Sequence, residues 1–234
     1  MVLRQLLHGK TPADAPGAIG RARLYEAFTA AAFAGHRRRF YRRLVELSGA
    51  APGDHVLDVG CGPGYLTALA AGAVTPGGHA TGIDPSPAMI GTARRLRGGP
   101  HCSFQLGRAE ALELADGSVD VVVSSFALHH VPEGVREAAF AEMFRVLRPG
   151  GRLLVADFRP PRGRLGRHMA GALAGPVMRD NPVARIAPMA RAAGFGTVTD
   201  GEVRPFAYYV HAVRPEKHLE PVDDQRRDEG NGAF

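Results

Sequence analysis

The sequence predicts an α/β protein in a single domain, built on a mostly parallel sheet with helices on both faces. From residue 36 onward, short apolar runs alternate with stretches whose apolar residues recur at helical spacing. Apolar runs without polar alternation are typical of strands that are buried on both faces. Helices between such strands favour βαβ units and a parallel sheet. The length of 234 residues is within the range of one domain.

The predicted elements follow one another in a regular order. Five apolar runs are expected to form the parallel strands: 55–59, 79–83, 102–106, 119–124 and 152–156. Three stretches between them have helical spacing: 65–74, 86–96 and 133–147. In the last of these, Val135, Ala139, Met143 and Val146 share one face. Two β-rich runs, 196–203 and 206–213, then follow each other without room for a helix, which predicts an antiparallel pair at a sheet edge.

Composition excludes several classes of protein. The chain is 45% apolar and 22% charged, which is normal for a globular protein and excludes disorder throughout. It has no run near the ~18 apolar residues that a membrane span needs, and the apolar part of its N-terminus is too short for a secretory signal. Two cysteines, Cys61 and Cys102, are too few for a disulfide framework or a zinc site. We therefore expect a soluble, cytoplasmic protein without a metal.

The net charge of +6 raises the question of a nucleic-acid partner. The densest basic cluster lies between Arg37 and Arg43 and alternates with Phe40, Leu44 and Leu47 at helical spacing. Because Arg38, Arg39 and Arg42 fall opposite that apolar stripe, the cluster is interpreted as the solvated face of a helix. Nucleic acid is therefore not the expected partner.

The strongest motif follows the first predicted strand. Asp58 stands two residues before the glycine-rich loop Gly60-Cys61-Gly62-Pro63-Gly64, and a helix follows. Glycines here allow a tight turn and close approach of a ligand to the backbone, with the amides of the helix N-terminus facing it. A dinucleotide fingerprint would require glycine at position 65, which is Tyr65. A Walker loop would require a lysine, and none lies between Lys10 and Lys217.

The second predicted strand ends in the segment Gly82-Ile83-Asp84-Pro85-Ser86. An acidic residue at this place, 24 residues after Gly60, can accept hydrogen bonds from both ribose hydroxyls of a nucleoside. Ser86 is a plausible N-cap of the next helix. The alternative is that Asp84 is only a turn residue before Pro85.

With these motifs the sequence resembles the class I S-adenosylmethionine-dependent methyltransferases, in particular the small-molecule group of the ubiquinone and menaquinone type. The resemblance runs from about residue 25 to 213 and depends on five ordered segments: LDVGCGPG (57–64), GIDPSPAMI (82–90), RAEAL (108–112), DGSVDVVVSSFALHHV (116–131) and RVLRPGGRLLVADF (145–158). The resemblance implies a Rossmann-like, seven-stranded, mostly parallel sheet whose last strand is antiparallel. It implies S-adenosyl-L-methionine as the cofactor and a small molecule as the methyl acceptor.

Site residues follow from the resemblance by position. The residues that would surround the methionine portion of the cofactor are Asp58, Gly60, Cys61, Gly62 and Gly64. Asp84 would hold the ribose, Pro85 and Met89 would flank the adenine, and Ser125 would offer backbone to the methionine amino group; Tyr25 is also assigned to cofactor binding. Arg108 stands where the family usually has an aspartate that accepts from the adenine amino group, and arginine has no acceptor. That contact is lost, is made by Glu110, or rests on the backbone of Ala109.

Two histidines follow the fourth predicted strand, at the sheet edge where open α/β folds bind ligands. A neutral imidazole can accept the proton of an acceptor hydroxyl near pH 7, so His130, and after it His129, are the candidate general bases. The alternative is that they cap the loop and hold Asp157 or backbone carbonyls. A reactive thiol at Cys61 is not expected, because packing in the loop requires a small side chain.

The motifs of two other enzyme classes are absent from the sequence. A short-chain dehydrogenase needs Tyr-x-x-x-Lys, and a DNA amino-methyltransferase needs Asn/Asp-Pro-Pro-Tyr/Phe where Ser-Ser-Phe-Ala stands; neither motif is present. Two alternative functions stay open, an RNA methyltransferase and a cofactor-binding protein without methyl transfer. The acceptor atom can be oxygen, nitrogen or carbon, and the protein can be a homodimer.

The chain is expected to have three regions. Residues 1–35 are expected to form a helical lid or cap, 36–213 the cofactor-binding core with a substrate lid at 158–181, and 214–234 a disordered tail.

Overall fold

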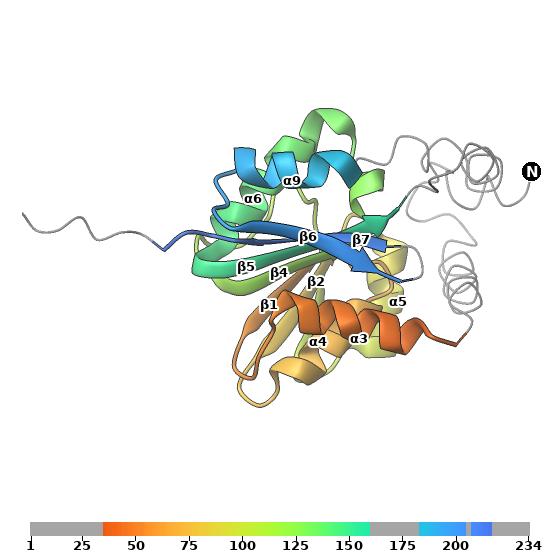
Figure 1. Cartoon of the computed structure of the whole chain (residues 1–234). Helices are drawn as coiled ribbons and strands as arrows, with labels where there is room; N and C mark the ends of the chain where they lie inside the picture. The colour runs from red at the N-terminus through yellow and green to blue at the C-terminus, as the bar shows by residue number, and fades with distance from the viewer. Residues whose placement is uncertain (1–34, 160–182, 205–206, 217–234) are drawn as a thin grey trace, which may run out of the picture.

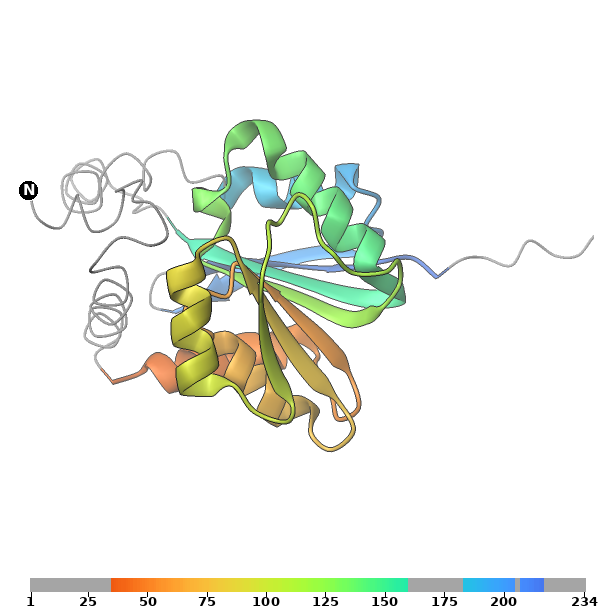
Figure 2. The same cartoon turned by 180° about the vertical axis from the view of Figure 1, so that it is seen from behind.

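In the computed structural model, described for residues 35–159, 183–204 and 207–216, a seven-stranded sheet has helices on both faces (Figures 1 and 2). The sheet order is β3-β2-β1-β4-β5-β7-β6. The first five strands are parallel, and β7 is antiparallel to both β5 and β6. The strands are β1 (His55–Val59), β2 (His79–Asp84), β3 (Cys102–Leu106), β4 (Val119–Ser125), β5 (Leu147–Phe158), β6 (Val198–Val203) and β7 (Ala207–Val213).

The helices form two layers with separate apolar cores. On one face lie α3 (Arg37–Ser48), α4 (Tyr65–Val74) and α5 (Pro87–Arg97), and on the other α6 (Arg136–Val146) and α9 (Val183–Ala192) (Figure 1). The first core includes Leu44 and Leu66, and the second includes Phe140 and Ile186. Strand residues alternate between the two cores, so the central strands are apolar throughout, as the sequence predicted. None of the described helices is both long and apolar enough to cross a membrane.

The predicted order of elements is confirmed, and two boundaries differ by more than two residues. The helix predicted over 133–147 begins at Arg136, because residues Glu133–Val135 form a short 3-10 turn first. Strand β5 begins directly at Leu147, where Leu147 pairs with Val119 before a register shift leads into the main ladder. The run 147–151 contains a proline and two glycines, and therefore has no strand signal of its own. Pairing with β4 extends the strand there.

Close packing at Gly64 gives a first testable prediction. Gly64 has φ +83°, and a Cβ on it would lie 2.4 Å from the ring of Phe104, which is buried under the loop. The substitution Gly64→Ala adds left-handed strain to overpacking, so we expect the free energy of unfolding to fall by about 2–3 kcal/mol in urea titration. Gly72→Ala is the matched control, because nothing outside its helix lies within 4 Å of the added methyl. It should stabilise the protein by about 0.5–1 kcal/mol.

Candidate functional site

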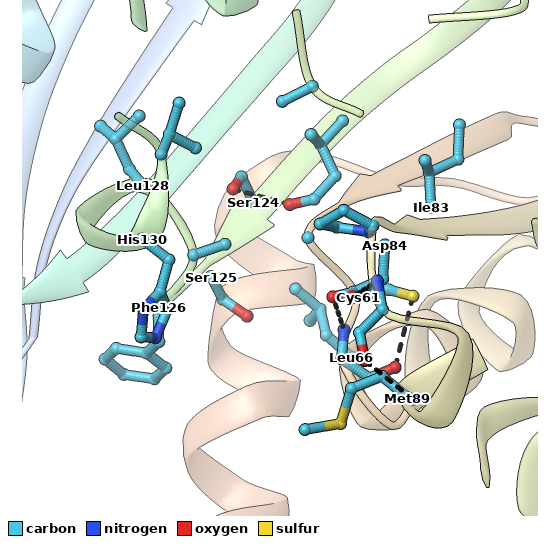
Figure 3. A pocket seen from close by; sticks show the side chains of 18 of the residues that line it. Cys61, Leu66, Ile83, Asp84, Met89, Ser124, Ser125, Phe126, Leu128 and His130 are labelled. Atoms are coloured by element: carbon cyan, nitrogen blue, oxygen red, sulfur yellow. Dashed lines mark hydrogen bonds between the residues drawn. The ribbon is translucent and has the colours of Figure 1, made fainter. Parts of the chain in front are cut away.

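A pocket of about 400 Å³ lies at the carboxyl ends of β1, β2 and β4 (Figure 3). Strand order reverses between β1 and β4, and a parallel sheet opens a crevice at such a switch point because the loops leave it in opposite directions. The volume is within the range of sites for small ligands. Asp84, Cys61 and Met89 lie along one side of the pocket, and Ser125, Phe126 and His130 along the other (Figure 3).

The loop after β1 lines the pocket with Gly60, Cys61, Gly62 and Pro63. The backbone N–H groups of Gly60 and Cys61 both donate to the carbonyl of Ile83, at 2.8 and 3.0 Å, which fastens the loop to β2. Gly60 has φ +76°, and a Cβ on it would lie 2.3 Å from the Cβ of Ala127. Only glycine therefore lets the loop pass this close to the segment after β4. Gly62, with φ +53° and no atom near its missing Cβ, faces open space at the pocket.

Asp84 anchors the same loop from the end of β2. Its Oδ2 accepts a hydrogen bond from the N–H of Gly62 at 2.9 Å, and its Oδ1 accepts one from the N–H of Ser86 at 2.9 Å. Burial raises the pKa of this carboxyl, and the two N–H donors oppose that effect. Each carboxylate oxygen keeps a second lone pair for a ligand hydroxyl. The residue thus joins the loop, the start of α5 and the pocket.

The predicted adenine end also lies at the pocket. Pro85, Met89, Ala109 and Glu110 all line it. Arg108 lines it as well, but its Nε donates to Oε1 of Glu110 at 2.6 Å, and 68% of its side chain is exposed. Glu110, at 17% exposed, places its carboxylate at the pocket next to this guanidinium.

Asp58, Gly64 and His129, three of the predicted site residues, are not among the residues that line the pocket. Gly64 packs on Phe104, and Asp58 is buried beneath the loop, where its Oδ2 accepts from the hydroxyl of Thr67 at 2.6 Å. The Oδ1 of Asp58 is buried without a hydrogen-bond partner. Tyr25 and residues 160–181 of the predicted lid lie outside the described residues.

Burial of Asp58 gives a second prediction. Loss of water contact raises the pKa of its carboxyl from 3.8 to about 7, against the lowering effect of the Thr67 hydroxyl. The folded protein therefore holds this proton where the unfolded chain releases it, so stability falls as pH rises from about 4 to 7. Asp58→Asn resembles the protonated form and should lack this contribution. Urea titrations measure the free energy of unfolding of the variant and of the wild type. We expect the difference between these two free energies to change by up to about 1.4 kcal/mol per pH unit near pH 5.5, in favour of the variant as pH rises.

The contradicting result would be identical pH slopes for wild type and Asp58→Asn between pH 4 and 7. Asp120→Asn is the matched control, since Asp120 sits at the opposite edge of the sheet, where its Oδ2 accepts from the N–H of His55. In this control, the difference from the wild type should not move in favour of the variant as pH rises from about 4 to 7.

The side chains of His129 and His130 lie in different environments. His129 has its Nδ1 2.7 Å from Oδ1 of Asp157, with the two side chains 7% and 0% exposed, and its N–H donates to Oδ2 of the same carboxylate. His130 follows in the same 3-10 turn and lines the pocket, with its ring centroid 4.1 Å from that of His129. The contact foreseen between the pair and Asp157 is therefore present at His129. His130 is the histidine that a ligand can reach.

Phe126 supports this side of the pocket in a conformation that is rare for a side chain of its size. Its φ is +53°, and its N–H donates to the carbonyl of Ala156 at 2.9 Å. Its ring packs on Phe158 with centroids 4.3 Å apart and stacks on Phe40 at 5.7 Å. Left-handed backbone at a large residue persists only where surrounding contacts hold it, and such residues gather at functional sites.

The sequence did not predict that residues of α3 and α4 line the pocket. Arg37 was expected with its cluster on a solvated helix face, but it is only 9% exposed and lines the pocket with Tyr41 and Tyr65. The difference has a helical cause, because Arg37 and Tyr41 are four residues apart and share a face beside the apolar stripe. Of the same cluster, Arg38, Arg39 and Arg42 are exposed, as predicted.

Both cysteines in and near the site are buried, which disfavours the thiolate form. Burial raises the pKa of the Cys61 thiol, with the nearby carboxyls of Asp58 and Asp84 adding to the effect. Burial also raises the pKa of Cys102 to about 11. A neutral, buried thiol is a poor nucleophile. No metal-binding group of three or more His, Cys, Asp or Glu side chains is found among the described residues.

Comparisons with known proteins agree with this geometry. Residues 56–151 match the methyltransferase domain family. A demethylmenaquinone methyltransferase of Symbiobacterium thermophilum is 35% identical over 147 residues, which are 61% of this chain and 58% of that protein. An arsenite methyltransferase of Halobacterium salinarum is 42% identical over 110 residues, 46% of this chain and 28% of that protein. The matched segment thus spans little more than half of the first relative and under a third of the second.

Solved structures share the fold. The crystal structure of an S-adenosylmethionine-dependent methyltransferase from Aquifex aeolicus superposes with a TM-score of 0.61 at 22% identity, over 74% of this chain and 88% of that chain. At that identity the likeness establishes the sheet and helix arrangement. Residues 56–151 therefore form a methyltransferase domain, and the ordered motifs and the sheet with its antiparallel last strand are those of the class I S-adenosylmethionine-dependent methyltransferases.

Proposed function

We propose that this protein transfers the methyl group of S-adenosylmethionine to a small, partly apolar acceptor. One observation carries the proposal: a single pocket combines the Asp84-anchored glycine loop with an apolar side next to an accessible histidine, His130. The cofactor supplies an activated sulfonium methyl group, so the protein's main task is to align the acceptor with it and to exclude water.

The cofactor side is assigned by the chemistry of its residues. Asp84 would accept the ribose hydroxyls, and Pro85 and Met89 would flank the adenine, with Glu110 in place of the missing aspartate. Gly60, Cys61 and Gly62 would offer their backbone to the methionine part, and Ser125 would do so from β4. Support for this assignment is that all of these residues line one pocket of suitable size.

Apolar groups are common among the residues that line the pocket. They include Phe126, Leu128, Val131, Pro132 and Met143, so an acceptor with an apolar or ring portion fits best. The relative from Symbiobacterium thermophilum is named for a quinone substrate, which supports a reduced quinone or similar ring as the acceptor. The relative named for arsenite is a weaker guide, because arsenite prefers soft thiolates and both cysteines of this chain are buried with raised pKa values.

His130 would accept the proton where the acceptor is a hydroxyl or an acidic carbon. The His129–Asp157 pair would hold the 3-10 turn that presents it, since Asp157 binds both the ring and the N–H of His129. In this assignment, His129 has the structural role and His130 the catalytic one.

A screen with radiolabelled S-adenosylmethionine tests the proposal. The acceptors are a reduced naphthoquinone, simple phenols, primary amines, arsenite with thiol, and transfer RNA. We expect label in a ring acceptor. Binding of transfer RNA through the exposed arginines of α3 should be weak and steeply dependent on salt, and no label should enter it. Label in RNA at physiological salt would favour the RNA alternative. Cofactor binding without label in any acceptor would favour a protein that binds the cofactor without methyl transfer.

A further inference from the structure

One helix layer holds the excess positive charge of the protein. The helices α3, α4 and α5 lie on the same face of the sheet and together contain eight arginines and one acidic residue, Glu46 (Figure 1). Their net charge is therefore +7, whereas the whole chain has a net charge of +6. Because the charges of all other residues nearly cancel, the basic character of the protein comes from this layer.

Most of these arginines face solvent. The exposed ones are Arg38, Arg39, Arg42, Arg43, Arg94 and Arg95. Arg43 pairs with Glu46 at 3.0 Å, and Arg94 donates to a backbone carbonyl at 2.9 Å. The other four form no ion pair with any described residue. Arg38 and Arg42 are four residues apart, a spacing at which like charges destabilise a helix, and an anionic surface would relieve that repulsion.

The basic side of α3 lies next to the pocket. Arg37, the first residue of the helix, and Tyr41 both line the pocket. Arg38 and Arg39 follow Arg37 in the same turn and are exposed. A surface bound by these arginines would therefore lie within one helical turn of the pocket, about 5 Å along the helix axis.

The aromatic residues of the layer favour a lipid surface over nucleic acid. Proteins bind single-stranded nucleic acid through exposed rings on which bases stack. Phe40 and Tyr41 are buried in this layer. The ring of Tyr65 has the guanidinium groups of Arg37 and Arg97 at 4.0 and 5.2 Å from its centroid. Each of these three rings is thus buried or already covered by arginine.

Uncharged groups accompany the arginines on this layer. Helix α4 contacts both α3 and α5 and contains no charged residue. Its exposed and half-buried positions include Ala68, Leu69, Gly72 and Ala73. Leu96 of α5 follows Arg95 and is 51% exposed. Arginines beside small apolar groups match the interface of an anionic bilayer, where guanidinium groups meet phosphates and apolar groups enter the headgroup region.

We propose that this basic face, formed by the exposed arginines of α3 and α5, binds the surface of an anionic lipid bilayer. An apolar acceptor concentrates in a bilayer, so docking there brings the pocket close to it. The choice of a bilayer rests on the proposed function, because it requires an apolar acceptor. Each arginine near an anionic surface strengthens binding by about fivefold, and salt screens the attraction.

Sedimentation of the full chain with vesicles tests the proposal. The vesicles contain phosphatidylcholine alone, or phosphatidylcholine and phosphatidylglycerol in a ratio of about two to one. We expect binding to the mixed vesicles at physiological salt, release at ~1 M salt, and no binding to phosphatidylcholine alone. The triple variant Arg38→Gln/Arg39→Gln/Arg42→Gln should bind the mixed vesicles at least about tenfold more weakly, because it lacks three of the charges.

A second triple variant, Arg148→Gln/Arg185→Gln/Arg191→Gln, is the matched control. It removes three exposed arginines outside the layer, so the net charge changes equally, and it should keep full vesicle binding. Equal losses in both variants would overturn the proposal, because net charge alone would then explain binding. Failure of the wild type to bind the mixed vesicles would also overturn it. Transfer RNA that displaces the wild type from the vesicles at physiological salt would favour nucleic acid instead.

Titration with S-adenosylhomocysteine separates docking from cofactor binding. Both triple variants should bind it like the wild type, because neither changes a residue that lines the pocket. Loss of this affinity in the α3 variant would assign its arginines to folding and overturn the proposal. Vesicle binding by a wild-type protein that does not bind S-adenosylhomocysteine would contradict the proposed function and leave the docking surface supported.

Discussion

Replacing His130 with Gln is expected to lower the turnover number by ~10²–10⁴, the usual contribution of a general base, while the affinity for S-adenosylhomocysteine stays unchanged. Gln keeps polarity and approximate size but cannot accept the proton. The expectation applies to an acceptor that loses a proton in the reaction, and it follows from the place of His130 on the pocket wall beside Phe126. Single-turnover kinetics with saturating cofactor measures it.

Two control variants show whether the loss of turnover is specific to His130. His55→Gln changes an exposed histidine at the start of β1, at the opposite edge of the sheet, and should leave turnover unchanged. His129→Gln removes a side chain bound to buried Asp157 and should lower the thermal midpoint. A parallel loss of cofactor affinity in His130→Gln would make that residue structural. Full activity of the variant would mean that alignment alone suffices, as it can for an acceptor that is already nucleophilic.

Replacing Asp84 with Ala is expected to weaken S-adenosylhomocysteine at least about tenfold. A carboxylate that accepts ribose hydroxyls makes charge-assisted bonds worth roughly 1.5–3 kcal/mol each. The variant should also lose stability, because the N–H groups of Gly62 and Ser86 lose their acceptor, at a cost of about 1–3 kcal/mol. The loss of affinity must therefore be measured well below the thermal midpoint of the variant.

Asp120→Ala is the matched control for Asp84→Ala. Asp120 also accepts from a backbone N–H, that of His55, and forms an ion pair with Arg148, but it lies at the end of the sheet away from the pocket. It should lose stability and keep full affinity for S-adenosylhomocysteine. Equal losses of affinity in both variants would mean that the effect at Asp84 comes from folding alone. Unchanged affinity in Asp84→Ala would mean that the ribose is held elsewhere.

The sequence predicted the sheet well because its signals are local. The central strands are apolar throughout, and the glycine loop after β1 needs a backbone that only glycine adopts easily, so both are visible in a single chain. The closing pair was predicted because no helix fits between its two runs, and it is confirmed as β6 and β7. Strand β5 was predicted too short, since the segment before Arg152 owes its conformation to pairing with β4.

The placement of side chains at the site was less predictable, since it depends on three-dimensional packing. Helical spacing placed Arg38, Arg39 and Arg42 opposite the apolar stripe, but it did not show that Arg37, in the same basic cluster, lies at a pocket. Likewise, the sequence ranked His130 before His129 as a candidate base, but it did not show which of the two pairs with Asp157. The roles of these residues stay predictions.

The pocket between Asp84 and His130 is assigned as a site for S-adenosylmethionine, and direct titration of the wild-type protein tests this assignment most simply. In isothermal titration calorimetry, S-adenosylhomocysteine should bind one site per chain, and NAD should give no heat of binding. At ~100 times its dissociation constant, S-adenosylhomocysteine should also raise the free energy of unfolding by about 2.7 kcal/mol. Saturable binding of NAD together with no binding of S-adenosylhomocysteine would contradict the account.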